Sequence, residues 1–289
     1  MNEREIKELE IEVLQTLRDG VQVTKTKSIP DIEQLALVAN TVSEVEVAIL
    51  YSDLVGSTKL VENRSSVDAV RIHKAFLRCA TRCIAGFGGK TVSFDGDRVM
   101  GLFAGDTKEV RAIECALMID RLVRQTINGR GAINPGIRQV TGIDVGAVHA
   151  TRAGIREQND IVWVGPAAFK AAKLCAIRRS DSSLHVSERV FRRVAQDPKQ
   201  NGIEGYTWNK LENPGGGTAG FKLVKRPERP PVPARSPKTS KPLSQDTKLN
   251  LSDVLPPPVD RDRLDYLASV LRGVKVKPSP IDSRLLTAA

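Results

Sequence analysis

The chain has 289 residues, of which 40% are apolar and 27% charged, proportions typical of a globular protein. No apolar run approaches the roughly 18 residues needed to span a bilayer, and the N-terminus lacks the basic-then-apolar order of a signal peptide. These features argue against a membrane or secreted protein, so we expect a cytoplasmic one. The cysteines fit that expectation. Cys79 and Cys83 lie one helical turn apart, and reduced buried thiols are a better interpretation than a shared metal because no second pair completes a site.

The net charge of +10 is concentrated near the C-terminus. From Lys222 onward there are 14 Lys/Arg and 7 Asp/Glu residues, a net of +7. The stretch 226–242 is rich in Pro, Lys and Ser, a composition that cannot build a core. We predict a solvated basic linker; loose contact with nucleic acid or an acidic surface is the alternative. No interleaved aromatic residues indicate a dedicated nucleic-acid domain.

Residues 3–18 carry apolar side chains at roughly helical spacing, and Asp19-Gly20 provides a stop signal. This helix is expected to pack on the main domain or on a second copy of the chain. A connector and a second short helix at 31–39 complete an N-terminal segment, 1–43.

A compact domain is predicted for 44–224. It begins with a buried strand at 45–51, followed by a long helix at 58–86. The remaining predicted elements are a hairpin at 88–94 and 98–103, a helix at 107–127, strands at 136–150 and 161–164, a helix at 166–178, a strand at 183–186, a helix from Ser187, and a strand pair at 206–211 and 220–224. This order predicts an α+β fold, with a mostly antiparallel sheet and helices on one face. A Pro-rich linker at 225–259 and a helical tail at 260–289 are expected to follow.

Two aspartates stand out in this domain. Asp53 ends the first strand, and Asp97 lies just after the Asp95-Gly96 hairpin signal, at the start of the return strand. If the two strands are neighbours, the carboxylates meet at one edge and repel unless a cation lies between them. Such oxygen ligands favour Mg²⁺ or Mn²⁺, and the Gly-Ser-Thr turn behind Asp53 suits a triphosphate. Together these parts predict a two-metal phosphoryl-transfer site. Taken singly, each aspartate is better explained as a turn or cap residue, and only the two segments together favour the metal site.

Four segments carry a family resemblance. YSDLVGST (51–58) and FDGDRVMGLF (94–103) resemble the first and second metal motifs of class III nucleotidyl cyclases. TGIDVGAVHA (141–150) resembles the long strand of that family, and VWVGPAAFKAAKL (162–174) resembles its strand and helix with the transition-state residues. The similarity covers about 45–195, a little over half of the chain. It implies the ferredoxin-like, palm-type cyclase fold.

The resemblance also implies a mechanism. Two Mn²⁺ or Mg²⁺ ions would bridge Asp53 and Asp97, with the carbonyl of Leu54 as a further ligand, and activate the ribose 3′-hydroxyl for attack on the α-phosphorus. Pyrophosphate would leave. In this family the sites form between two subunits, which implies a homodimer. The backbone of five consecutive residues would cradle the β- and γ-phosphates: Leu54, Val55, Gly56, Ser57 and Thr58.

The base-reading positions depart from the purine cyclases. Ser93 and Val162 stand where adenylate cyclases have Lys and Asp, and the Glu of guanylate cyclases is absent at 93. Tyr51 and Arg98 make the chain resemble the bacterial Pycsar cyclases of antiphage defence, which convert UTP or CTP to the cyclic monophosphate. We expect both residues to contact the base. The alternatives are that Tyr51 is a core residue of the strand and that Arg98 is a surface charge of the hairpin.

Two further departures concern the helix at 166–178. Phe169 and Lys173 stand where the family has a ribose-orienting Asn and a transition-state Arg. Lys173 keeps the positive charge but lacks the planar fork of Arg. Phe169 cannot replace an Asn hydrogen bond, and could stack on a sugar or base or belong to the core. The leading hypothesis is a uridylate cyclase that makes a second messenger on phage infection. The alternatives are a cytidylate or purine cyclase, or a catalytically silent nucleotide-binding regulator.

Overall fold

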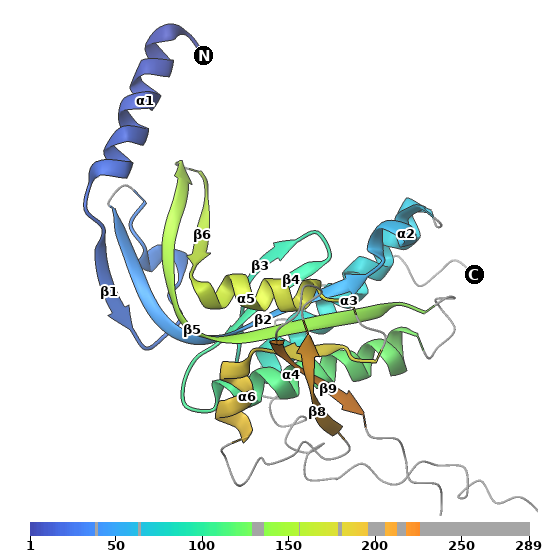
Figure 1. Cartoon of the computed structure of the whole chain (residues 1–289). Helices are drawn as coiled ribbons and strands as arrows, with labels where there is room; N and C mark the ends of the chain where they lie inside the picture. Colours follow the sequence, from blue (N-terminus) through green and yellow to red (C-terminus); the bar gives the residue numbers. More distant parts are fainter. Residues whose placement is uncertain are drawn as a thin grey trace, which may run out of the picture. The chain divides into compact units, whose positions relative to one another are not determined.

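The computed structural model describes residues 1–225 apart from 38–39, 63–64, 129–135, 156, 179–180, 196–205 and 213–217 (Figure 1). The predicted Pro-rich linker and helical tail lie outside the described residues, so their boundaries stay predictions. Within the described part of the chain, no helix is long and apolar enough to cross a membrane.

A nine-stranded sheet forms the centre of the fold, in the order β3-β4-β2-β5-β7-β9-β8, with β1 paired to β2 and β6 to β5. The strands are β1 (Gln22–Thr26), β2 (Thr41–Val55), β3 (Lys90–Asp95), β4 (Arg98–Phe103), β5 (Arg138–Ile155), β6 (Gln158–Val164), β7 (Leu184–Val186), β8 (Tyr206–Glu212) and β9 (Thr218–Lys225). Only the β1–β2 and β5–β7 pairs among these are parallel. The predicted α+β fold with a mostly antiparallel sheet is confirmed.

Helices cover both faces of this sheet, which corrects the expectation of one face. The helices are α1 (Glu3–Arg18), α2 (Ser57–Glu62), α3 (Ser66–Gly86), α4 (Lys108–Leu122), α5 (Pro166–Ala176) and α6 (Glu188–Ala195), with a 3₁₀ turn at Ile32–Gln34 and a π-helical turn at Val123–Ile127. The larger apolar cluster joins α3 and α4 to alternate residues of β2, including Ala48 and Leu50. The smaller cluster joins α5 to the residues between them, including Val47 and Ile49. Since β2 is buried on both faces, it reads as an unbroken apolar run.

The close packing of α5 on β5 depends on a glycine. A Cβ at Gly142 would lie 2.3 Å from the carbonyl oxygen of Ala171 and 2.3 Å from the backbone nitrogen of Cys175. The face of α5 against the sheet is built from Ala167, Ala168 and Ala171. Small residues on both sides let the two backbones approach closely, so α5 has a defined position over the sheet.

The segment after β2 contains two helices rather than the single one predicted for 58–86. α2 ends at Glu62, and α3 begins anew behind Ser65. The Ser65 hydroxyl accepts a hydrogen bond from the backbone N–H of Asp68 at 3.1 Å, a typical N-cap contact. This local cap competes with helix continuation, which explains the break.

Helix α1 projects from the sheet domain, and none of its residues is buried (Figure 1). Its six large apolar side chains are 44–77% exposed: Ile6, Leu9, Ile11, Val13, Leu14 and Leu17. A capping box between Asn2 and Glu5 begins the helix, and the Asn40 amide donates to the carbonyls of Thr16 and Asp19 at its end. The expected packing of this helix on the main domain is not seen; packing on a second copy stays a prediction.

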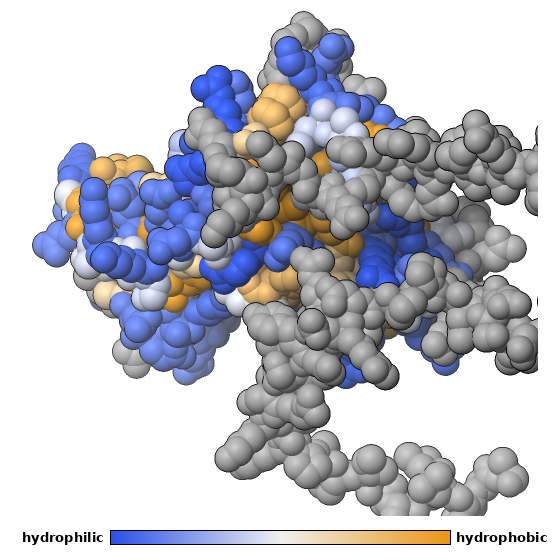
Figure 2. All heavy atoms as spheres, turned by 90° about the horizontal axis from the view of Figure 1, so that it is seen from below, coloured by the Kyte–Doolittle hydropathy of each residue, from blue (hydrophilic) through white to orange (hydrophobic). Residues whose placement is uncertain are grey.

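Figure 2 shows a different view of the surface, where hydrophobic patches lie among hydrophilic side chains.

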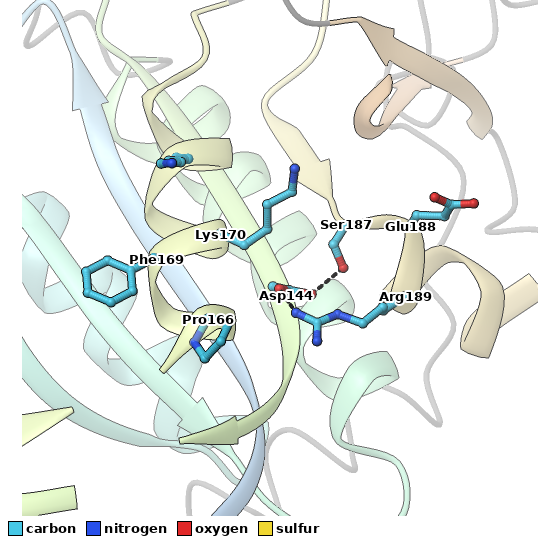
Figure 3. Close-up of a pocket in the computed structure, with 8 residues that line it drawn as sticks. Asp144, Pro166, Phe169, Lys170, Ser187, Glu188 and Arg189 are labelled. Carbon is cyan, nitrogen blue, oxygen red and sulfur yellow. Dashed lines mark hydrogen bonds and ion pairs between the residues drawn. The ribbon is translucent and has the colours of Figure 1, made fainter. Parts of the chain in front are cut away.

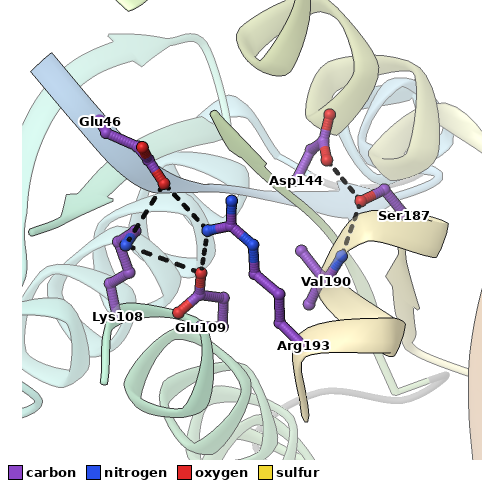
Figure 4. Close-up of polar contacts among 7 residues, drawn as sticks. All are labelled: Glu46, Lys108, Glu109, Asp144, Ser187, Val190 and Arg193. Atoms are coloured by element: carbon purple, nitrogen blue, oxygen red, sulfur yellow. Dashed lines mark hydrogen bonds and ion pairs between the residues drawn. The ribbon is translucent and has the colours of Figure 1, made fainter. Parts of the chain in front are cut away.

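A network of charged side chains connects β2, α4 and α6 (Figure 4). Arg193 donates to Glu109 at 2.7 Å and to Glu46 at 3.0 Å, and Lys108 lies 3.6 Å from Glu46 and 3.7 Å from Glu109. The hydrogen bond from Arg193 lowers the pKa of Glu46, whereas Glu109 raises the pKa of Arg193. Glu109 is buried, and these contacts give its side chain ionic partners in place of water.

Candidate active site

The C-terminal end of β2 carries the first part of the site. Asp53 lies two residues after Tyr51, so both side chains point to the sheet face that α5 covers. Asp53 is only 5% exposed. Tyr51 is half-buried against the smaller apolar cluster. A carboxylate this close to an apolar core needs a compensating charge.

The β3–β4 hairpin brings Asp97 to the same edge. Its turn consists of Gly96 and Asp97, one residue later than expected, so Asp97 belongs to the turn and the return strand begins at Arg98. Gly96 has φ of +61°, a conformation that favours glycine. Ser52 pairs with Val99 across β2 and β4, and continuing that register places Asp53 opposite Arg98, with Asp97 next along the chain.

Two arginines face the Asp53 carboxylate. Its Oδ2 atom accepts a hydrogen bond from Nη2 of Arg178 at 2.7 Å and lies 3.6 Å from Nη2 of Arg98. Asp97, in contrast, has a buried Oδ2 atom without a hydrogen-bond partner. A buried carboxylate oxygen that lacks a partner beside a second, cation-paired carboxylate suits a divalent metal ion.

The metal ligands cannot all come from side chains. Among the residues that the structure describes, no group of three or more His, Cys, Asp and Glu side chains is placed to hold an ion. Asp53 and Asp97 would therefore need backbone carbonyls, water and phosphate oxygens as further ligands. Mg²⁺ and Mn²⁺ commonly bind in this way, so the two aspartates fit the predicted metals.

The five-residue turn predicted after Asp53 is wrong in extent: Leu54 and Val55 continue β2, Gly56 alone forms the turn, and Ser57 and Thr58 begin α2. Gly56 has φ of +78°, and a Cβ there would meet no atom within 4 Å, so the glycine serves backbone conformation rather than packing. α2 has only six residues. Any phosphate contact would therefore come from the N–H groups of the turn itself rather than from the dipole of a long helix.

Tyr51 and Arg98 lie beside Asp53, and their predicted contact with the base stays a prediction. Burial raises the pKa of the Tyr51 hydroxyl, while the nearby positive charge of Arg98 opposes that shift. Tyr51 therefore remains a neutral hydrogen-bond donor at physiological pH. The Nε atom of Arg98 is buried and without a partner. Arg98 is thus directed into the site and is not the surface hairpin charge of the alternative interpretation.

Phe169 and Lys173 lie on α5, outside this group of residues. Phe169 is 63% exposed, which rules out the core role considered for it. A cavity of about 500 Å³ lies between α5 and the start of α6. Its lining consists of Asp144, Pro166, Phe169, Lys170, Lys173, Ser187, Glu188 and Arg189. In Figure 3, Phe169 and Lys170 extend from opposite sides of α5, and the amine of Lys170 is turned away from Asp144. None of the contacts found for the described residues connects Lys173 to Asp53.

The sequence did not reveal two ionic contacts. Arg178 follows α5 and contacts Asp53, which lies 125 positions earlier in the chain. No local sequence pattern therefore predicts this contact. Asp144, fully buried in β5, accepts hydrogen bonds from Ser187 and Arg189 (Figure 3). A single acid within the apolar stretch TGIDVGAV was the available signal for Asp144, because a buried carboxylate needs a partner.

The four cysteines are free thiols, in agreement with the sequence interpretation. Burial raises the pKa of the Cys115 thiol and raises that of Cys175 to about 12. Cys175 donates to the Val140 carbonyl at 3.3 Å. The Cys115 and Cys175 thiols are therefore structural groups at neutral pH.

Comparison with known proteins identifies the family. A scan against protein-family models finds no match. The chain is 35% identical over 201 residues to a uridylate cyclase of Xanthomonas perforans, covering 66% of this chain and 86% of that protein. It is also 35% identical over 189 residues to a uridylate cyclase of Burkholderia cepacia, covering 63% and 82%. A bacterial light-regulated adenylyl cyclase superposes with a TM-score of 0.53 at 25% identity, over 63% of this chain and 90% of that one. The chain therefore belongs to the class III nucleotidyl cyclases, in the family of these uridylate cyclases, and is a nucleotidyl cyclase.

Proposed function

We propose that the enzyme converts UTP to 3′,5′-cyclic UMP and pyrophosphate with the help of two Mg²⁺ or Mn²⁺ ions. The observation that carries this proposal is the placement of Tyr51, Asp53 and Arg98 together at the buried end of β2. The relatives named uridylate cyclase support the choice of substrate.

Asp53 and Asp97 would hold the ions, together with the carbonyl of Leu54. The ions would supply Lewis-acid activation of the ribose 3′-hydroxyl and neutralise charge on the triphosphate. The segment from Leu54 to Thr58, which joins β2 to α2, would direct backbone N–H groups at the β- and γ-phosphates. The positive φ of Gly56 supports this role, because it allows the chain to turn from β2 into α2 three residues after Asp53.

Tyr51 and Arg98 would select the base. Tyr51 is partly buried against the apolar cluster on the α5 side of β2, and a base bound there would have room for a single pyrimidine ring rather than a purine. Arg98 can only donate hydrogen bonds. It therefore suits the O4 carbonyl of uracil better than the amino group of cytosine at the same position. This difference favours UTP over CTP.

We further propose a homodimer with two sites between the subunits. Lys173 and Phe169 lie on the exposed side of α5, away from the Asp53 of their own chain. An exposed lysine on one subunit could then supply positive charge to the α-phosphate held by the other. Phe169 would stack on the sugar or base.

Resemblance to the Pycsar cyclases supports a role of the product as a second messenger in cytoplasmic antiphage defence. Two other functions remain to be tested against this one. A cytidylate or purine cyclase would have the same metal site with a different base preference. A silent nucleotide-binding module is favoured by Phe169, which cannot form the hydrogen bonds of an Asn.

The test is to incubate the pure protein with each of the four ribonucleoside triphosphates and Mn²⁺, and to identify products by mass spectrometry. Cyclic UMP as main product is the expected result, and Asp53→Ala and Asp97→Ala should abolish it while leaving the circular dichroism spectrum unchanged. Cyclic CMP, AMP or GMP as main product would overturn the substrate assignment. Nucleotide binding without any cyclic product would favour the silent module.

A further inference from the structure

The carboxylate proposed to bind metal already has a cation in contact with it. Arg178 donates from Nη2 to Asp53 Oδ2 at 2.7 Å, a charge-assisted hydrogen bond of ordinary length. Arg98 lies farther from the same oxygen, at 3.6 Å. Asp53 is 5% exposed, so the two guanidinium groups balance a charge that water hardly reaches.

Arg178 is held in this place by the end of α5. Its Nη1 atom donates to the carbonyl oxygen of Cys175 in the last turn of that helix. The Cys175 thiol in turn donates to the Val140 carbonyl of β5, and Val140 is the cross-strand partner of Asp53. The guanidinium group is therefore positioned by packed backbone rather than by a flexible loop.

Arg178 can nevertheless leave Asp53. Its side chain is 38% exposed, whereas that of Asp53 is 7% exposed, so the guanidinium group has a route to solvent that the carboxylate lacks. A divalent ion at Asp53 would bring a larger charge to the same oxygen. A metal and a guanidinium group cannot both occupy the space directly in front of Oδ2.

We propose that Arg178 is a positioning residue that neutralises and orients Asp53 in the metal-free enzyme, and that it must release Oδ2 before a divalent ion binds there. This inference rests on the proposed assignment of Asp53 as a metal ligand. Arg178 thus lowers the affinity of the site for metal while it holds the Asp53 side chain in position. Because Arg178 is attached to α5, binding of metal at Asp53 also removes a contact of the helix that carries Phe169 and Lys173.

The direct test measures Mn²⁺ binding to the full-length, nucleotide-free protein from the electron paramagnetic resonance signal of free Mn²⁺. Arg178→Gln should bind Mn²⁺ about tenfold more tightly than the wild type, equivalent to about 1.4 kcal/mol. Arg178→Lys, which keeps the charge without the planar fork, should give an intermediate affinity. Arg192→Gln is the matched control, since Arg192 pairs with Glu188 on the exposed side of α6, and its affinity should equal that of the wild type.

A second measurement separates competition from a general change in fold. Without metal, Arg178→Gln should melt at a lower temperature than the wild type, because Asp53 loses its nearer counter-charge. Saturating Mn²⁺ should raise that melting temperature by more than it raises the wild-type value. In the Asp53→Asn background, Arg178→Gln should no longer increase Mn²⁺ affinity.

Folded Arg178→Gln protein with unchanged or weaker Mn²⁺ affinity would overturn the inference. So would an equal gain of affinity in the Asp53→Asn background, since the effect would then not pass through that carboxylate. These outcomes are distinct from failure of the proposed function. A wild type that makes no cyclic UMP but shows the predicted metal affinities would overturn the substrate assignment and leave the role of Arg178 intact.

Discussion

Replacing Gly142 with alanine tests whether the position of α5 matters for catalysis. The new methyl group would lie 2.3 Å from the Ala171 carbonyl oxygen and 2.3 Å from the Cys175 nitrogen. Both atoms belong to the helix backbone, so α5 or β5 has to shift by roughly 1 Å to relieve the overlap. Overpacking of this kind costs about 1–3 kcal/mol of stability. A 1 Å displacement of catalytic groups can lower turnover about 100-fold.

The free energy of unfolding would be measured by urea denaturation and the turnover number by formation of the cyclic product. Gly20→Ala is the matched control, because a Cβ at Gly20 meets nothing within 4 Å and its φ is not positive, and both quantities should match the wild type. We expect Gly142→Ala to fold with reduced stability and to lose most of its turnover. Wild-type turnover in a folded Gly142→Ala protein would show that the position of α5 does not control the reaction.

Two further predictions concern the base pocket and the charged network. Tyr51→Ala should widen the pocket and reduce the preference for UTP over ATP by about tenfold, the scale of one lost contact, measured as the ratio of kcat/KM values. Unchanged selectivity would exclude Tyr51 from base reading. Arg193→Met should reduce stability by about 1–2 kcal/mol in urea denaturation, a value discounted for the partial exposure of Arg193. Since the pKa of Glu46 is lowered in the folded state, its stabilising contribution is present at neutral pH and lost as the pH falls through that lowered value. The Arg193→Met protein should therefore lose less stability than the wild type on acidification, and an unchanged pH dependence would contradict this.

The sequence predicted those helices and strands that are defined by a local pattern of neighbouring residues. The buried strand that carries Asp53, the β3–β4 hairpin, the long β5 strand and α5 all appear near their expected places, although the first strand continues two residues beyond Asp53 to Val55. The number of helical layers was not predictable in the same way. The sheet-facing side of α5 is made of alanines, which give only a weak apolar stripe, so its burial on the second face depends on tertiary packing.

The residues of the candidate site differ in the same way: some are predicted by a local sequence pattern and others are not. Asp53 and its turn could be recognised because the apolar strand, the aspartate and Gly56 lie within a few residues of one another in the sequence. Arg178 could not, because its ionic contact follows from how closely α5 approaches β5 at Gly142. Nothing in the composition of the segment around Arg178 distinguishes it from the other basic residues of the chain. Long-range ion pairs of this kind depend on the folded geometry alone.

The two halves of the proposed site lie in different surroundings on one chain, which leads to a complementation test. Asp53 is buried beside Arg178, whereas Lys173 is exposed on α5. If each site combines Asp53 of one subunit with Lys173 of the other, Asp53→Ala and Lys173→Ala chains should each be nearly inactive alone. Mixed in equal amounts with free exchange, half of the dimers would contain both chains and one intact site each, which restores about one quarter of wild-type activity.

The matched control is a mixture of Asp53→Ala with Asp97→Ala, because both changes affect the same half of the site. That mixture should remain inactive. Subunit exchange would be verified by co-purification of differently tagged chains. Absence of recovery in the Asp53→Ala and Lys173→Ala mixture, despite verified exchange, would mean that the reaction does not combine these residues across subunits. Recovery in that mixture alone would show that Lys173 acts in the site of the neighbouring subunit, as its exposure on α5 leads us to expect.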